Sequence, residues 1–252
     1  PDPLPTTESE SDATTEGEKE FRVAEAAGLD TRHFNIPLLR AVIGETPVHD
    51  RWKAAWGALV ARHESLRTFF EEDDEGVLRR RVVPTVDAAF EFTRQPTRAA
   101  ALLWARERQS APFTLAVPPL WRAGLITVDD GTAPLFWATL HHSVGDGQSL
   151  GILSHELTAL LEDRPLPPAP YGWSRLAARE RAYLNGPDGA ADGVWWRDSL
   201  AALPDEAYDD WALDLPRSPA TPPGTYAFAL TLDAATSAAL KAAARRRMVS
   251  LH

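Results

Sequence analysis

The strongest constraint on the fold is an apolar segment that runs through a short polar loop into an amphipathic pattern. Residues 132–142, TAPLFWATLHH, form an apolar run of strand length that Pro134 opens, which predicts a buried strand. Beyond Gly147, apolar residues recur at helical spacing at Leu150, Leu153, Leu157, Leu160 and Leu161. We therefore expect an amphipathic helix over residues 149–162.

Strand-like and helix-like patterns alternate in the rest of the chain. Helical spacing of apolar residues begins after Asp50, which we expect to cap that helix, and a second helix is predicted from Arg98 to Gln109. Short strands are predicted in VLRRRVVP, AAFEFTRQP and TYAFALTLD, and helices around Trp173–Leu184 and through VWWRDSLAAL. This alternation indicates an α/β or α+β fold.

Composition excludes several classes of function. The chain has no cysteine, which removes disulfides, zinc-thiolate sites and thiol nucleophiles and agrees with a cytoplasmic location. Its net charge of -10 argues against nucleic acid as the main partner, because phosphate binding needs clustered Lys and Arg. No apolar run approaches the roughly 18 to 20 residues that span a bilayer.

A nucleophile pattern lies within the same loop. Residues 147–151, GQSLG, fit G-x-S-x-G, which in α/β-hydrolases presents a serine on a sharp turn directly after a strand. Here the six residues His141 to Asp146 separate the apolar run from Gly147, and the only later histidines are His155 and His252. We therefore favour an N-cap role for Ser149 over a catalytic one.

Two further interpretations concern the paired histidines. His141, His142 and Asp146 could supply three metal ligands, although the loop between them is not helical and no good fourth ligand lies upstream. Alternatively, both histidines are simply buried at the end of a strand.

A third interpretation rests on the whole segment His141–Gly147, HHSVGDG. It resembles the HHxxxDG signature of the chloramphenicol-acetyltransferase-like superfamily, most closely that of the condensation domains of nonribosomal peptide synthetases. The flanking sequence LHHSVGDGQSLGILSHEL resembles the family's HHxxxDGxSxxxLxxEL pattern. Further family-like segments occur in the expected order: FNIP, RHESLRTFF, APFTLAVPPLWRAGL and VWWRDSLAALP.

The resemblance implies a two-lobe fold, of which this chain would cover the N-terminal lobe and the start of the C-terminal lobe. Residues 1–20 are acidic and poor in apolar residues, which predicts a loosely held arm or an exposed first helix. The resemblance implies an N-terminal lobe over 21–164. A connector with helices would follow over 165–225, and the second lobe would begin over 226–252. Because that lobe is incomplete, we expect the chain to be part of a longer protein and to be inactive alone.

The resemblance also implies a reaction and residue roles. An amine would attack an acyl or peptidyl thioester held on the phosphopantetheine arm of a carrier protein, and would form an amide. His142 would accept the proton of the amine or hold the amine in line, and His141 would support the loop. Asp146 would form a structural salt bridge with Arg67 or Arg62, so Asp146→Ala would mainly harm solubility. Gly147 would leave room for substrate.

No metal and no directly bound cofactor are implied, and the expected partners are carrier proteins, the acceptor and the remainder of the second lobe. The opening segment departs from the family because it lacks the usual Gln and aromatic residue and is more acidic, which leaves the acceptor side open. A free-standing ester- or amide-forming acyltransferase and a non-catalytic recruitment domain remain alternatives. An epimerisation domain is disfavoured because Leu150 replaces the aromatic residue typical of that group.

Overall fold

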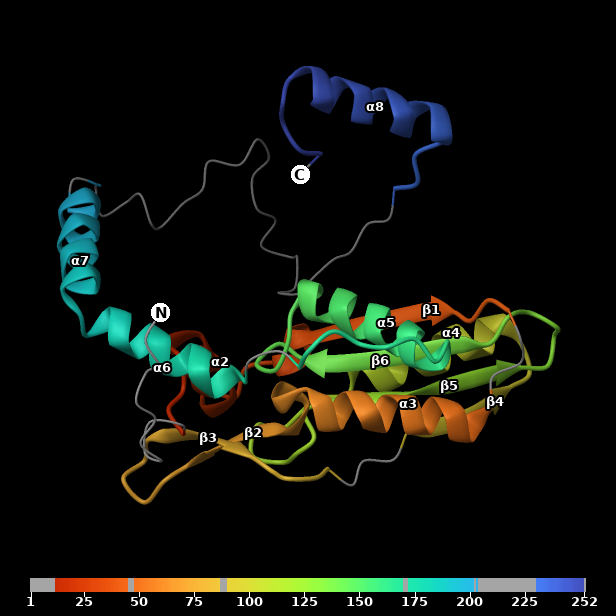
Figure 1. Ribbon diagram of the computed structural model, residues 1–252, viewed down its shortest axis with the longest axis horizontal. Coiled ribbons are helices and arrows are strands. Elements are labelled where there is room, and N and C mark those ends of the chain that lie inside the picture. The colour runs from red at the N-terminus through yellow and green to blue at the C-terminus, as the bar shows by residue number, and fades with distance from the viewer. Residues whose placement is uncertain are drawn as a thin grey trace, which may run out of the picture. The chain divides into compact units, whose positions relative to one another are not determined.

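A computed structural model describes residues 12–44, 48–86, 90–169, 172–201, 203 and 230–251 (Figure 1). The chain divides into two compact units, Pro1–Pro204 and Asp205–His252. In the described part of the second unit, helix α8 spans Ala234–Arg246 and starts at an N-cap formed by Asp233. Residues 225–229 of the strand expected in TYAFALTLD lie outside the described residues.

The first unit mixes helices and strands, as the sequence predicts. Its elements are α2 (Glu16–Ala26), the 3₁₀ turn η1 (Thr31–Phe34), β1 (Asn35–Ala41), α3 (His49–Arg62), the 3₁₀ turn η2 (Glu64–Arg67), β2 (Thr68–Glu72), β3 (Leu78–Val82), β4 (Glu91–Gln95), α4 (Arg98–Ser110), β5 (Trp121–Val128), β6 (Leu135–His141), α5 (Gly147–Leu161), α6 (Trp173–Leu184) and α7 (Pro187–Leu200). The helices expected from 98, from 173 and through VWWRDSLAAL are confirmed. The predicted cap at Asp50 is wrong, because α3 starts one residue earlier and Val48 occupies the N-cap position.

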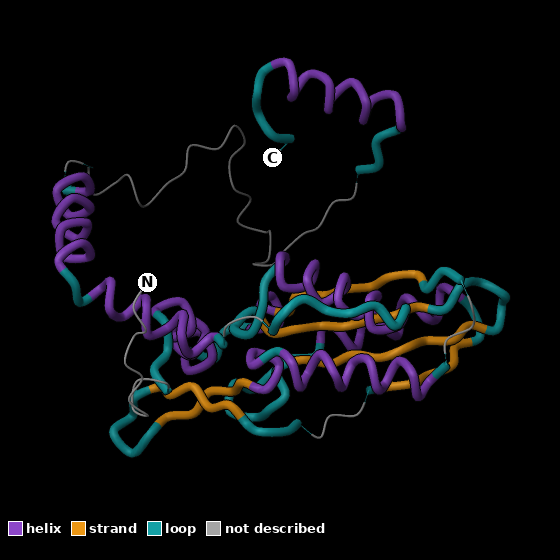
Figure 2. Tube along the Cα trace, in the orientation of Figure 1, coloured by secondary structure: helices purple, strands orange, loops and turns teal. Residues whose placement is uncertain are grey.

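The described strands form two sheets, which Figure 2 shows in orange. The larger sheet has the order β1-β6-β5-β4, in which β6 is antiparallel to both of its neighbours and β4 is parallel to β5. Helix α4 provides the crossover that a parallel pair requires. The smaller sheet is the antiparallel hairpin of β2 and β3.

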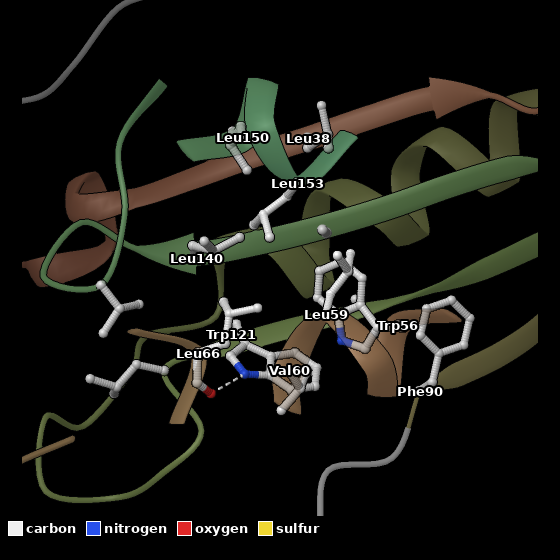
Figure 3. Packing of buried hydrophobic residues seen from close by; sticks show 14 of the residues in the cluster. Leu38, Trp56, Leu59, Val60, Leu66, Phe90, Trp121, Leu140, Leu150 and Leu153 are labelled. Carbon is white, nitrogen blue, oxygen red and sulfur yellow. Dashed lines mark hydrogen bonds between the residues drawn. The ribbon is translucent and has the colours of Figure 1, made fainter. Parts of the chain in front are cut away.

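Strand β6 is covered on both faces, which explains its unbroken apolar sequence. All seven of its residues are buried. Phe136, Ala138 and Leu140 belong to the main core, which α3 and α5 complete with Trp56, Leu59, Val60, Leu150, Leu153 and Leu157 (Figure 3). Leu135 and Trp137 belong to a second cluster, to which α4 contributes Ala101 and Ala105. In the main core Trp121 Nε1 donates to the carbonyl oxygen of Leu66 at 2.8 Å, drawn dashed in Figure 3.

Helix α2 begins within the segment 1–20, for which a loosely held arm or an exposed helix was expected, and it is anchored to the rest of the unit. The Glu18 carboxylate accepts hydrogen bonds from Arg80 on β3, with one N–O distance of 2.6 Å, and from Trp173 Nε1 on α6 at 2.9 Å. The side chains of Arg80 and Glu18 are 0% and 4% exposed. Residues 1–11 lie outside the described residues. This acidic segment therefore contains the start of a helix whose first-turn carboxylate, that of Glu18, is buried in an ion pair.

Candidate active site

The loop after β6 places its two histidines in different environments. His141 is the last residue of β6, lies opposite Asn35 on β1 and is 2% exposed. Its Nδ1 lies 2.8 Å from Ser143 Oγ and accepts the backbone N–H of Ser143 at 3.2 Å. Because Nδ1 accepts, the ring proton of neutral His141 belongs on Nε2. His141 is thus a buried residue that shapes the loop from inside.

Aromatic rings surround His141. The ring centroids of Phe21, Phe34 and Phe113 lie 5.2, 5.9 and 6.1 Å from that of His141, each in an edge-on arrangement. Burial lowers the pKa of His141 to about 4, and the nearby charges of His142 and His33 act in the same direction. His141 is therefore neutral near pH 7.

His142 is exposed and begins the loop. Its backbone N–H donates to the carbonyl oxygen of Phe34 at 2.8 Å, which fixes the backbone at this point. Its ring lies beside Phe21, with centroids 6.2 Å apart and planes at 21°. Of the two histidines, only His142 combines a backbone held by a hydrogen bond with an exposed side chain.

Asp146 starts helix α5, which corrects two expectations. Its Oδ1 accepts the backbone N–H of Ser149 at 2.8 Å and the hydroxyl of Ser149 at 2.7 Å, so Asp146 and not Ser149 is the N-cap. These hydrogen bonds also lower the pKa of Asp146. The helix begins at Gly147, two residues before the expected start.

The expected salt bridge of Asp146 with Arg67 or Arg62 is wrong for the described residues. Asp146 is exposed, so no buried charge requires compensation there. Arg67 donates to the carbonyl oxygens of Val60 at 3.2 Å and Val83 at 2.8 Å. Arg62 instead pairs with Glu156 of α5 at 3.1 Å.

Glu156 belongs to this region; it is the glutamate of the quoted HHxxxDGxSxxxLxxEL pattern, but the sequence analysis assigned it no role. Its carboxylate is 2.6 Å from His63 Nε2 and accepts a hydrogen bond from Arg62 Nε at 3.1 Å. Nη2 of Arg62 also donates to the carbonyl oxygen of Pro167 at 2.7 Å. Burial raises the pKa of Glu156, but the hydrogen bonds from His63 and Arg62 outweigh it, so the pKa is lowered overall. A pocket of about 510 Å³ is lined partly by these three side chains. The sequence did carry one signal for this residue: Glu156 is a charged residue between Leu153 and Leu157 of the apolar stripe.

The loop glycines differ in what surrounds them. A Cβ on Gly147 would meet no atom within 4 Å, so packing does not require glycine at this position. A Cβ on Gly145 would lie 3.0 Å from Leu140 Cδ2, which is tighter than ordinary contact. The expectation that Gly147 leaves room for substrate stays a prediction.

Neither a metal-binding cluster nor a membrane-spanning helix is found among the described residues. No group of three or more His, Asp or Glu side chains among them is placed to hold a metal ion. None of the helices described has the length and apolarity needed to cross a membrane.

Comparisons with known proteins agree on one family. A family profile described as "Condensation domain" matches residues 22–252. A plipastatin synthase from Bacillus subtilis (strain 168) is 32% identical over 197 residues, which cover 75% of this chain and 7% of that protein. The chain therefore spans only a small part of this curated relative.

Solved structures share the fold. A structure that describes condensation domain-mediated chain release from the enacyloxin polyketide synthase is 29% identical with a TM-score of 0.60, covering 69% of this chain and 35% of that one. The condensation domain of the Monacolin K polyketide synthase is 19% identical with a TM-score of 0.75, covering 95% and 56%. The fold class expected from the sequence is confirmed.

Proposed function

Because the chain belongs to the condensation-domain family, we propose that it carries the catalytic loop of an acyltransferase of nonribosomal peptide synthesis. The donor would be an acyl or peptidyl thioester on the phosphopantetheine arm of a carrier protein, and the acceptor an amine. One observation supports this most strongly: His142 is exposed at the end of a fully buried strand, with its backbone held by Phe34.

The proposed chemistry uses His142 as the proton acceptor. The amine nitrogen attacks the thioester carbonyl carbon, so that a C–N bond forms and the C–S bond breaks. The imidazole takes the proton that the amine loses, and a proton returns to the departing sulfur, which leaves as the thiol of the carrier arm. Histidine suits this task because an unperturbed imidazole titrates at about pH 6.5, near the working pH.

The neighbouring residues would have supporting roles. His141, neutral and buried, would keep the loop in shape without competing for the proton. Asp146 would fix the start of α5, and Gly147 would leave space for the reactants. We further propose that 165–225 connects to a second lobe that begins over 226–252, that this lobe completes the site, and that the protein works in the cytoplasm with carrier proteins as partners.

The test uses the full-length protein that contains this chain. A carrier protein loaded with an acyl group is offered with amine acceptors, and amide formation is followed by mass spectrometry. We expect wild type to form amide, His142→Ala to form almost none while remaining folded, and His155→Ala, which removes an exposed histidine of α5, to behave as wild type. Normal turnover by His142→Ala would refute the role of His142.

An ester product is the second candidate. The 29% identity to a condensation domain that acts in chain release from a polyketide synthase favours testing it. A hydroxyl acceptor would need the same proton acceptor, so the same assay includes alcohols. Ester without amide would select this candidate, and binding of the loaded carrier with neither product would select a recruitment domain.

A further inference from the structure

The imidazole of His142 has little to orient it except one aromatic neighbour. No hydrogen bond of this ring is present among the described residues, whereas a histidine that accepts protons in catalysis is commonly oriented by a carboxylate or carbonyl on its other nitrogen. The backbone contact with Phe34 fixes where the side chain starts but not the plane of the ring.

Phe21 of α2 lies beside that plane. The two rings are nearly parallel, at 21°, with centroids 6.2 Å apart, inside the range in which aromatic pairs interact. We propose that Phe21 is a positioning residue for His142: its ring holds the imidazole plane and covers one of its sides, so that the acceptor approaches from the other. This inference rests on the proposed function and adds a specific residue to it.

Phe21 is itself held in place, which a positioning residue requires. Its ring is edge-on to Phe34, with centroids 4.9 Å apart at 85°, and edge-on to His141 at 5.2 Å and 73°. These two edge-on contacts hold the Phe21 ring, whose plane lies at 21° to that of His142.

The helix that carries Phe21 is tied to the unit at three further points. Glu18 pairs with Arg80 at 2.6 Å, Arg22 with Glu72 at 2.9 Å, and Glu25 Oε1 accepts the backbone N–H of Leu115 at 3.0 Å. Since these contacts lie on both sides of Phe21 in α2, the helix cannot move away from the loop without breaking them. The geometry is therefore set before substrate arrives, as efficient positioning demands.

The test distinguishes the effect of a planar aromatic ring at position 21 from that of an apolar side chain. In the full-length protein, Phe21→Leu keeps an apolar side chain but removes the ring, and Phe21→Tyr keeps the ring. We expect Phe21→Leu to lower kcat about tenfold with the KM of the loaded carrier unchanged, and Phe21→Tyr to stay within about twofold of wild type. The matched control is Phe90→Leu, which removes a buried ring of the main core that packs among Trp56, Phe92 and Phe136. It should leave kcat unchanged.

A spectroscopic readout does not depend on turnover. The ring current of Phe21 should shift the imidazole proton resonances of His142, and this shift should disappear in Phe21→Leu and persist in Phe21→Tyr and Phe90→Leu. A wild-type kcat in Phe21→Leu, or imidazole resonances that do not change, would overturn the inference. If wild type itself forms no product, the proposed function fails and the positioning role falls with it; an active wild type with an active Phe21→Leu defeats the positioning role alone.

Discussion

Replacing Glu18 by glutamine is expected to destabilise the first compact unit by about 3 to 5 kcal/mol, the range seen when one partner of a buried ion pair is removed. The structure explains why the loss of stability should match that of a buried ion pair and not the smaller loss typical of an exposed one. Arg80 has a fully buried side chain, and its Nη2 lies 2.8 and 2.6 Å from the two Glu18 oxygens. Its Nη1 has no hydrogen-bond partner within the described part of the chain, so no further hydrogen bond there replaces what the Glu18 carboxylate supplies. Trp173 Nε1 and the backbone N–H of Thr15 also depend on this carboxylate, at 2.9 and 2.7 Å.

Urea unfolding of the chain, followed by tryptophan fluorescence and circular dichroism, measures the effect. With a slope of about 2 to 3 kcal/mol/M, the loss corresponds to a fall of roughly 1 to 2.5 M in the urea midpoint. The control Glu16→Gln removes an exposed pair with Lys19 and should change stability by at most about 1 kcal/mol. The double variant Glu18→Leu/Arg80→Leu should recover much of the loss, because it leaves no unpaired buried charge. A midpoint of Glu18→Gln equal to that of Glu16→Gln, or a double variant as unstable as the single one, would refute this reasoning.

Three further predictions concern the loop and the sheet. Burial lowers the pKa of His141 to about 4, whereas in the unfolded chain this imidazole takes up its proton at about 6.5. The free energy of unfolding should therefore be highest above pH 6.5 and fall toward pH 4, by a contribution on the order of 3 kcal/mol. His141→Asn should remove this part of the pH dependence in urea titrations at pH 7.5 and 5. Asp146→Ala should destabilise by about 1 kcal/mol through loss of the α5 cap and Asp146→Asn by much less, measured by thermal unfolding, and equal losses would argue against the cap. Gly124→Ala should cost about 1 to 3 kcal/mol, because a Cβ would press on the carbonyl oxygen of Glu91 in β4, whereas Gly147→Ala should be nearly neutral for stability; chemical denaturation of the pair distinguishes them.

Local sequence patterns predicted the helices and strands well where the apolar residues followed one simple pattern. The apolar run before His141 and the leucine stripe after Gly147 led directly to β6 and α5. A strand buried on both faces has an unbroken apolar sequence, and a helix buried on one side has apolar residues at helical spacing. The start of α5 was wrong by two residues because Asp146 and Ser149 are both good caps, and only the backbone geometry shows which of them accepts.

Long-range pairing is what the sequence could not supply. Arg62 lies 94 residues from Glu156, and nothing local to either residue selects that partner over Asp146. The same holds for Glu18, whose acidic neighbourhood suggested a solvated arm although its partner Arg80 is 62 residues away on β3. The placement of Phe21 beside His142 depends on that anchor, so it was equally out of reach.

The loop with its two histidines emerges from β6, the most enclosed strand of the described sheet. Amide protons in such a strand exchange with solvent only when the whole unit opens, because no smaller opening exposes them. The imidazole of His142 is therefore attached to the part of the molecule that fluctuates least. Heating should leave the geometry of this loop intact until cooperative melting, at which point the site and the fold are lost together.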